Sequence, residues 1–319
     1  MDSVAVAPPK VAIVGAGSVG ATLAYACLIK GAGKTIALYD INADKTRAEA
    51  LDLNHGLQFV PMATMTGSDD IEVCRDANVV VITAGAKQKP GQSRLDLAET
   101  NIHMCRKLVP ALLDVAPDAV VLLVTNPVDV LTYAALKFSG LPASRVFGSG
   151  TVLDSSRLRL LIAQRCGVAV QSVHAYIAGE HGDSEIPLWS SATIGAVPLL
   201  RWQVEGRPPL DGAAREAIFT GVVHAAEEII RGKGATNYAV GLAGARIVEA
   251  VVHDEKLVMP VSSMLDNYAG ISDVCLSMPS VVDRSGVQTV LPVPLSDAET
   301  EGLRRSADTV RAVIRKLGL

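Results

Sequence analysis

A histidine flanked by small residues is the first candidate for chemistry in this chain. His181 lies in the segment Ala178-Gly-Glu-His-Gly-Asp-Ser184. The glycines on both sides leave its imidazole accessible, which suits a group that donates and accepts a proton near neutral pH. The chain has six histidines, and most histidines serve no such purpose. This segment alone therefore leaves a catalytic and a non-catalytic histidine equally open.

A glycine-rich loop near the N-terminus predicts a nucleotide site. Gly15, Gly17 and Gly20 fit the pattern G-x-G-x-x-G between a strand-like run and a helix-like run. The first glycine permits a tight turn, the second admits a pyrophosphate, and the third lets helix and strand pack closely. Asp40 ends the next strand-like run, where a carboxylate binds ribose hydroxyls and repels a 2′-phosphate. The loop favours NAD over NADP; the alternative is a glycine turn that serves only packing.

The first half of the chain alternates the strands and helices that must position these residues. Runs that are apolar on both faces are typical of parallel strands covered by helices. Their alternation with helices at this spacing predicts βαβ units. The expected strands are Lys10–Gly15, Thr35–Asp40, Asn78–Thr83 and Ala119–Val124, and the expected helices are Val19–Lys30 and Ala43–His55.

After about Ser149 the pattern changes to longer helices and shorter strands. Ser296 opens the last amphipathic helix, with Glu299 as its capping-box partner three residues on. Two more helices are expected at Leu153–Arg165 and from Asp211 to about Arg231. The expected strands are Val173–Ile177, Trp189–Ile194, Lys256–Val261, Val274–Ser280 and Thr289–Val293, the last three in a mixed or antiparallel sheet.

These elements predict an α/β protein in two parts. We expect an N-terminal Rossmann domain with a doubly wound parallel sheet, followed by a C-terminal α+β catalytic domain. The expected boundaries are a loose tail at 1–9, the NAD-binding domain at 10–149 and the substrate-binding domain at 150–319. A length of 319 residues fits two domains at ~150 residues each.

Composition and charge exclude several classes of protein. Hydrophobic residues make up 49% and charged residues 19%, which excludes disorder over most of the chain. A net charge of −4 without a basic block argues against a nucleic-acid binder. No apolar run approaches the ~18 residues that span a bilayer, and the N-terminus lacks the features of a signal peptide. The five scattered cysteines fit neither zinc-ligand spacing nor a disulfide framework. We expect a soluble cytoplasmic protein with free thiols and no metal.

Five motifs in order along the chain carry a resemblance to a known family. They are GAGSVG with Asp40, AGAKQKPGQSRLDL at 84–97, VTNPVD at 124–129, GTVLDSSR at 150–157, and GEHGDSE at 179–185. From about Lys10 to the C-terminus the chain resembles the lactate/malate dehydrogenase family, and within it the L-lactate dehydrogenases of bacterial type. The resemblance implies NAD-dependent hydride transfer between (S)-lactate and pyruvate, in glycolysis and pyruvate fermentation.

The resemblance also implies catalytic roles that suit the residue types. His181 would donate the proton to the pyruvate carbonyl oxygen, and Asp154 would bind its other ring nitrogen. Arg157 would bind the substrate carboxylate with two parallel hydrogen bonds. Arg94 would close over the substrate from a mobile loop and polarise the carbonyl. Asp154 and Arg157 are three residues apart and share a face of the expected helix.

Further binding positions follow from the same resemblance. Val240, four residues after Thr236, is expected near the nicotinamide. The implied substrate-binding residues are Gln88, Arg94, Asn126, Asp154, Arg157 and Thr236. The implied NAD-binding residues are Gly15, Gly17, Val19, Gly20, Asp40, Lys45, Gly85, Ala86, Val124, Thr125, Asn126 and Ser149.

The choice of substrate depends on Gln88. Malate dehydrogenases have an arginine there to bind the second carboxylate of oxaloacetate. A neutral glutamine leaves that carboxylate without a counter-charge, which discriminates far more strongly than a missing methylene. Pyruvate is therefore expected, with malate or another 2-keto acid as the alternative because the basic neighbours Lys87 and Lys89 weaken the argument.

Two alternatives come from other classes of protein. A non-catalytic NAD-binding protein should have lost at least one of Arg94, Asp154, Arg157 and His181, and all four are present. A short-chain reductase should carry a Tyr-x-x-x-Lys pair after the nucleotide-binding half, and no matching pair is found.

The resemblance finally implies regulation and assembly. Arg159 lies two positions after Arg157, which places them on nearly opposite helix faces, so Arg159 points away from the substrate. Arg159 and His174 match the family's binding positions for fructose 1,6-bisphosphate across a two-fold axis. A homotetramer is expected, with a dimer as the alternative. A solvated arginine and an interface histidine that bind no ligand remain the other interpretation of this pair.

Overall fold

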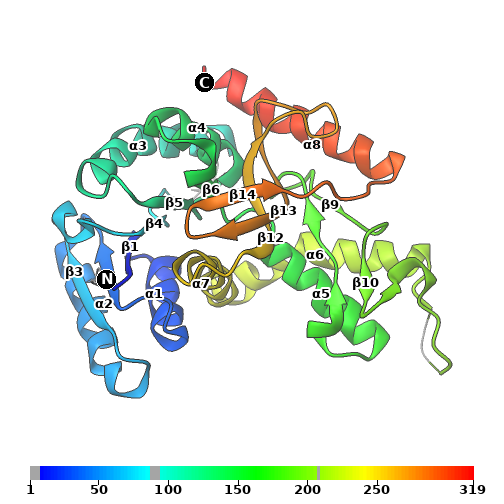
Figure 1. The fold of residues 1–319 in the computed structure, drawn as a ribbon, viewed down its shortest axis with the longest axis horizontal. Coiled ribbons are helices and arrows are strands. Elements are labelled where there is room, and N and C mark those ends of the chain that lie inside the picture. The colour runs from blue at the N-terminus through cyan, green and yellow to red at the C-terminus, as the bar shows by residue number, and fades with distance from the viewer. Residues whose placement is uncertain (1–7, 87–93, 207–208) are drawn as a thin grey trace, which may run out of the picture.

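One nine-stranded sheet forms the centre of the protein (Figure 1). A computed structural model describes residues 8–86, 94–206 and 209–319. The strands follow the order β14-β13-β12-β6-β5-β4-β1-β2-β3. Their bounds are β1 Lys10–Val14, β2 Thr35–Tyr39, β3 Thr64–Ser68, β4 Val79–Ile82, β5 Val120–Leu123, β6 Val146–Gly148, β12 Leu257–Leu265, β13 Val274–Asp283 and β14 Gly286–Val290.

Six of these strands form the expected parallel sheet. The order β3-β2-β1-β4-β5-β6 is that of a doubly wound dinucleotide-binding fold, in which the strand order reverses beside β1. Lys10 pairs with Thr35 of β2, and Val11 pairs with Val79 of β4. The carboxyl ends of β1 and β4 therefore meet at one edge, where ligands bind in such sheets.

The second half of the chain extends this same sheet. β12, β13 and β14 are antiparallel, as the sequence predicted for this region, and β12 pairs with β6 through Ser262 and Gly148. The antiparallel strands thus continue the nucleotide-binding sheet instead of forming a sheet of their own.

Helices cover both faces of the sheet, and alternate residues of each strand face different cores. Ala12 and Val14 of β1 belong to the core beneath α3 and α4, together with β13 and α8. Val11 and Ile13 belong to the core beneath α1 and α7. Figure 1 shows α3 and α4 on one side of the sheet and α1 and α7 on the other. This two-sided burial explains why the strands are continuous apolar runs.

The helix ends are capped, and one of the caps was predicted from the sequence. Gly31 caps α1 in the left-handed conformation, with φ 65°. Ser296 and Glu299 form the expected capping box of α8. The α-helices are α1 Ser18–Lys30, α2 Ala43–His55, α3 Arg94–Val115, α4 Val128–Ser139, α5 Val152–Cys166, α6 Gly212–Lys233, α7 Tyr238–Val252 and α8 Asp297–Lys316.

Several short strands of the second half differ from the prediction, because other groups take their backbone partners. The run Val173–Ile177 is divided into β7 (Val173–His174) and β8 (Ile177–Ala178), where Arg159 Nε donates to the oxygen of Ala175 at 2.9 Å. The run Trp189–Ile194 keeps only β10 (Thr193–Ile194), since the amide of Ser190 donates to Glu299. The remaining short strands are β9 Ile186–Pro187 and β11 Val197–Pro198.

The last predicted strand is displaced towards the N-terminus. β14 covers Gly286–Val290 instead of Thr289–Val293. Pro292 and Pro294 lack amide hydrogens, so the ladder ends before them.

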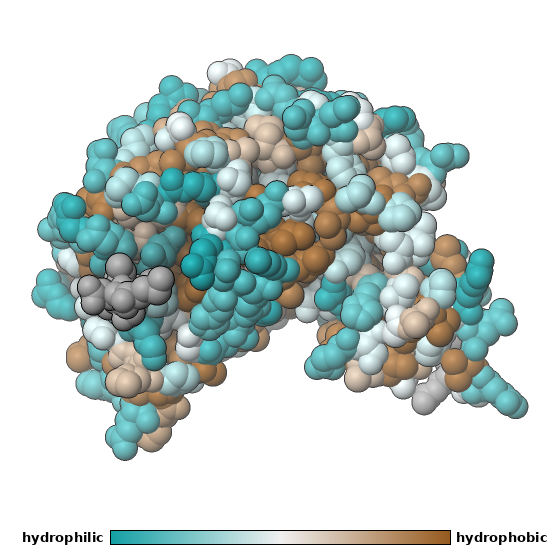
Figure 2. All heavy atoms as spheres, viewed as in Figure 1, coloured by the Kyte–Doolittle hydropathy of each residue, from teal (hydrophilic) through white to brown (hydrophobic). Residues whose placement is uncertain are grey.

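A third, smaller core holds the projecting part of the second half together. It joins α5 and α6 to the strands β7 and β10. In Figure 2 this part protrudes beside the main body, and a band of apolar side chains crosses the middle of the face shown. Among the described residues, no helix is long and apolar enough to cross a membrane.

Candidate active site

A cavity of about 1160 Å³ lies at the carboxyl ends of β1, β2, β4 and β5. Most of the binding residues expected from the sequence line it, including residues from both halves of the chain. Thr236 and Val240, from the second half, face the same space as the glycine loop. The expected residues in its lining are Gly15, Gly17, Val19, Asp40, Gly85, Ala86, Val124, Thr125, Asn126, Thr236 and Val240.

The three glycines of the loop meet different surroundings, as the motif requires. Gly15 has a positive φ of 110°, and a Cβ there would lie 2.6 Å from the amide nitrogen of Ala84. A Cβ on Gly20 would lie 1.8 Å from the oxygen of Gly15, so helix α1 could not pack against the loop. A Cβ on Gly17 would meet nothing within 4 Å, although Gly17 lines the cavity. This open space before the N-terminus of α1 fits the pyrophosphate of a dinucleotide.

Asp40 is held at the end of β2 by backbone amides. Its Oδ2 accepts from the amide of Ala16 at 2.7 Å, and its Oδ1 accepts from the amide of Asn42 at 3.0 Å. The carboxylate is thus tied to the glycine loop and lines the cavity between Tyr39 and Ile41. A ribose that reached this carboxylate would find acceptors already oriented.

Three of the expected NAD-binding residues lie outside the lining of the cavity. Gly20 is buried beneath the loop, and Lys45 is exposed on α2. The amide of Ser149 donates to the oxygen of Leu123 at 2.8 Å. Gln88 and the side chain of Arg94 lie outside the described residues; the backbone of Arg94 begins α3.

Asn101 was not predicted, but its side chain joins two walls of the cavity. Its Oδ1 accepts from the amide of Ala86 at 2.8 Å, and its Nδ2 donates to the oxygen of Asn126 at 2.9 Å. A fully buried asparagine in α3 thus fixes the strand ends after β4 and β5. A polar residue on the otherwise apolar face of an amphipathic helix was the available signal.

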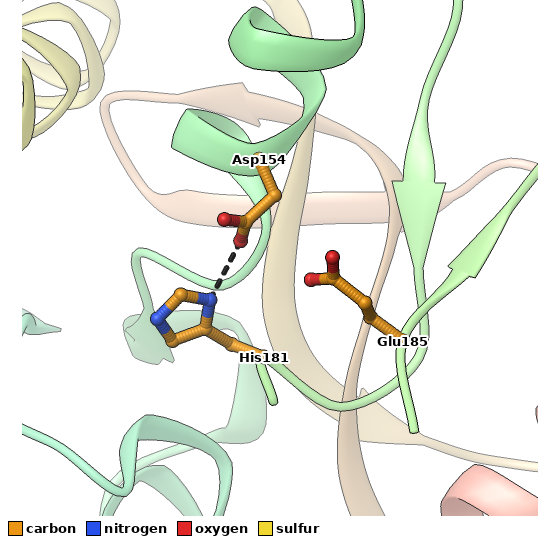
Figure 3. Close-up of side chains that lie close together, drawn as sticks. All are labelled: Asp154, His181 and Glu185. Atoms are coloured by element: carbon orange, nitrogen blue, oxygen red, sulfur yellow. Dashed lines mark hydrogen bonds and ion pairs between the residues drawn. The ribbon is translucent and has the colours of Figure 1, made fainter. Parts of the chain in front are cut away.

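In the second half, the structure brings together the histidine, the aspartate and the arginine predicted to act on the substrate. His181 Nδ1 lies 2.6 Å from Asp154 Oδ2, as Figure 3 shows. Arg157 Nη1 donates to Asp154 Oδ1 at 2.8 Å, across one turn of α5. Asp154 is 2% exposed, whereas the side chain of His181 is 28% exposed. The buried carboxylate therefore holds the imidazole with its Nε2 edge available to a reactant.

Electrostatics favour a charged imidazole in this arrangement. Burial lowers the pKa of His181, but the charge and hydrogen bond of Asp154 outweigh burial and raise that pKa to about 9. Burial likewise opposes ionisation of Asp154, but the charges of His181 and Arg157 hold its pKa below the ordinary value. His181 is therefore an imidazolium at neutral pH, with a proton to donate.

Glu185 is a second residue that the sequence did not single out, although it lies within the quoted GEHGDSE motif. It is 6% exposed, and its carboxyl points towards the Asp154–His181 pair (Figure 3). Carboxylate and ring nitrogen atoms of the three residues lie within 4.8 Å of one another. Burial, followed by the charge of Asp154, raises the pKa of Glu185 to about 8.

Arg159 of α5 contacts the segment that follows β7, and His174 lies on β7. The guanidinium of Arg159 stacks on Tyr176, 4.7 Å from the ring centroid, and binds the oxygen of Ala175. His174, the neighbour of Ala175, is exposed on β7. The guanidinium of Arg159 is therefore bound to the residue that follows His174 in the chain.

Both halves of the chain match known domains. Residues 9–148 match the lactate/malate dehydrogenase NAD binding domain, and residues 151–318 match the alpha/beta C-terminal domain of the same enzymes. The chain belongs to the lactate/malate dehydrogenase family. It is 56% identical to an L-lactate dehydrogenase of Bifidobacterium animalis subsp. lactis, over 98% of each chain. It is 46% identical to an L-lactate dehydrogenase of Thermoanaerobacter sp., over 97% of this chain and 99% of that protein.

Solved structures of the family share the fold over almost the whole chain. The minor L-lactate dehydrogenase of Enterococcus mundtii has a TM-score of 0.91 at 39% identity, covering 98% of this chain and 99% of that one. A lactate dehydrogenase from a Medee basin deep-sea metagenome has a TM-score of 0.93 at 38% identity, with the same coverage.

Proposed function

We propose that this protein is an L-lactate dehydrogenase that interconverts (S)-lactate and NAD⁺ with pyruvate, NADH and a proton. The observation that supports this most is the hydrogen-bonded series His181–Asp154–Arg157, which carries a charged imidazole at neutral pH. The similar chains named L-lactate dehydrogenase favour the same activity. Reduction of pyruvate returns NAD⁺ to glycolysis, as in fermentation.

Each residue of the series has one task in the reduction of pyruvate. His181 donates a proton from Nε2 to the carbonyl oxygen, while Asp154 orients the ring and stabilises its positive charge. Arg157 binds the substrate carboxylate through the guanidinium nitrogens that face away from Asp154. Arg94 polarises the carbonyl. Bound NADH supplies the hydride.

The two halves of the chain divide the ligands between them in this proposal. Residues 10–149 bind NAD through the glycine loop, Asp40 and the strand ends that line the cavity. Residues 150–319 supply His181, Asp154, Arg157 and Thr236 for the substrate, and residues 10–149 add Gln88, Arg94 and Asn126. Asn126 and Thr236, one from each half of the chain, both line the cavity and both contact the substrate in this proposal. Asp40 selects NADH over NADPH.

The decisive experiment replaces the proposed proton donor. His181→Ala should lower kcat for pyruvate by about 10²–10⁴-fold, the usual contribution of a general acid, and leave the Kd for NADH unchanged. His224→Ala is the matched control, because that side chain is 63% exposed on α6. A decrease of less than about tenfold in His181→Ala would mean that another group donates the proton.

We further propose that the enzyme is a cytoplasmic homotetramer activated by fructose 1,6-bisphosphate. Arg159 and His174 supply the supporting observation, since the guanidinium of Arg159 binds the backbone oxygen of Ala175, the residue next to the exposed His174. Two such pairs facing one another across a two-fold axis repel until a doubly phosphorylated sugar neutralises them. The ligand would then favour the assembled state.

Activation is tested by pyruvate saturation with and without millimolar fructose 1,6-bisphosphate, at pH 6 and at pH 8. The sugar should lower the pyruvate KM in the parent and should not do so in Arg159→Gln. An unchanged KM in the parent at both pH values would refute activation. Sedimentation at assay concentration tests the tetramer separately.

A further inference from the structure

We infer that Asp129, a buried carboxylate of the nucleotide-binding half, is a positioning residue for His181. It holds the backbone of the histidine from the opposite half of the chain and adds a negative charge that favours the imidazolium. This inference rests on the proposed role of His181 as proton donor.

The geometry joins three elements that are distant in the sequence. Asp129 lies in the first turn of α4 and is 2% exposed. Its Oδ2 accepts from the amide of His181 at 2.7 Å, and its Oδ1 accepts from Ser262 Oγ of β12 at 2.6 Å. Both carboxylate oxygens thus accept a hydrogen bond. One bond comes from the catalytic loop, residues 179–185, and the other comes from the strand that extends the sheet.

The same turn of chain reaches the cavity at the carboxyl ends of the strands. Asn126, three residues before Asp129, lines that cavity. The bond from Asp129 to His181 therefore fixes the distance between the cavity wall and the proton donor. Ser306 of α8 secures the loop one residue earlier, because its Oγ accepts from the amide of Glu180 at 2.7 Å.

The charge of Asp129 matters as well as its hydrogen bonds. Burial raises the pKa of Asp129 to about 6, although the bonds from Ser262 and from the His181 amide oppose this rise. Because both neighbours donate, the ionised carboxylate is the form that suits them. At pH 7 and above Asp129 is therefore negative and favours a proton on His181.

Other titratable and charged groups also affect the pKa values of Asp129 and His181. Asp154 of α5 and Glu185 of the catalytic loop raise the pKa of His181, and Asp154 is also bound to Arg157. Glu180 of the same loop raises the pKa of Asp129. Burial, followed by the charge of Asp129, raises the pKa of the Cys275 thiol on β13. None of these groups binds the amide of His181. Asp129 therefore both accepts the hydrogen bond from this amide and places a negative charge near the imidazole.

Three variants separate the charge from the hydrogen bonds. In Asp129→Asn the amide can accept from the His181 amide and donate to Ser262 Oγ, since a hydroxyl can reverse its role. This variant removes only the charge. Ser262→Ala keeps the charge and the His181 bond and removes one hydrogen bond. Asp129→Ala removes everything.

The measurement is kcat/KM for pyruvate against pH, together with NADH affinity by fluorescence. In Asp129→Asn the alkaline limb should move down by about half a pH unit or more, whereas Ser262→Ala should keep the parent profile. Asp129→Ala should show the same shift and a kcat lower by about tenfold or more, because a displaced donor is a poor one. The Kd for NADH should stay within about twofold of the parent in all three, since uniform damage to the fold would change it as well.

Coincident pH profiles for Asp129→Asn and the parent would overturn the inference, as would an equal shift in Ser262→Ala. If Asp129→Ala does not fold, the comparison of the other two variants still decides. Full activity of His181→Ala would refute the proposed function itself. Loss of activity in His181→Ala with an unshifted Asp129→Asn profile would refute this inference alone.

Discussion

Replacing Asp154 by asparagine should turn a pH-insensitive reduction into a pH-sensitive one. His181 and Arg157 bind different oxygens of the Asp154 carboxylate, and an amide has an NH2 group in place of one of these oxygens. Burial lowers the pKa of His181, and without the charge of Asp154 the main effect that raises this pKa is gone. The pKa of His181 should therefore fall from about 9 to its ordinary value of 6.5 or lower. That difference corresponds to about 3 kcal/mol of preference for the imidazolium.

The magnitude follows from the fraction of enzyme that carries the proton. At pH 6 the imidazolium fraction falls only about 1.3-fold, because both forms of the enzyme are still mostly protonated. At pH 8 it falls from about 0.9 to about 0.03, which is about 30-fold. The ratio of parent to variant kcat/KM for pyruvate should therefore grow by about 20-fold between pH 6 and pH 8, in addition to a constant loss from misorientation.

The assay follows NADH absorbance at saturating NADH in buffers of constant ionic strength. Asp308→Asn is the matched control, since that side chain is 73% exposed on α8, and its ratio to the parent should stay flat with pH. A large but pH-independent loss in Asp154→Asn would show that Asp154 only orients the ring. The electrostatic part of the reasoning would then be wrong.

Four further predictions concern other parts of the molecule. Asp40→Ser should narrow the preference of kcat/KM for NADH over NADPH, and equal use of both cofactors by the parent would contradict the ribose assignment. Gln88→Arg should move the ratio of kcat/KM for oxaloacetate and pyruvate by at least about tenfold towards oxaloacetate, because a guanidinium pairs with the second carboxylate; a smaller change would exclude Gln88 as the discriminator. The five cysteines are buried and free, and burial raises the pKa of three of them to about 12. The native protein should therefore react very little with a thiol reagent, and five thiols should react in denaturant. The pKa of His181 in the folded protein lies above its ordinary value, so protonated His181 stabilises the fold fully below pH 6.5, and this stabilisation is lost as the pH rises through about 9. The part of the Tm decrease over this interval that His181 causes should be absent in Asp154→Asn.

The glycine loop and the Asp154–Arg157 pair could be predicted from the sequence because, in each case, the residues involved lie within a few positions of one another. The glycine loop is defined by three residues within six positions, and each meets the surroundings that the motif requires. The pairing of Asp154 with Arg157 follows from their spacing on one helix. Strands that are buried on both faces appear in the sequence as apolar runs.

The unpredicted features depend on contacts between distant segments. Asp129 and His181 are 52 positions apart, and no local pattern pairs them. β3, with the sequence TMTGS, is an edge strand without an apolar run, and β6 has only three residues. Arg159 divides one predicted strand by binding the carbonyl of Ala175, which only the folded chain brings within reach.

The antiparallel strands β12, β13 and β14 also limit how the enzyme can be taken apart. They cover the edge of β6, and β13 packs against the buried side of α4. A fragment cut at residue 149 would expose both an unpaired strand edge and an apolar helix face, which together favour aggregation. The cofactor-binding half is therefore not a transferable module at that boundary. A chimera that exchanges this half with a relative's should carry the three strands with it, or match their side chains to the new β6 and α4.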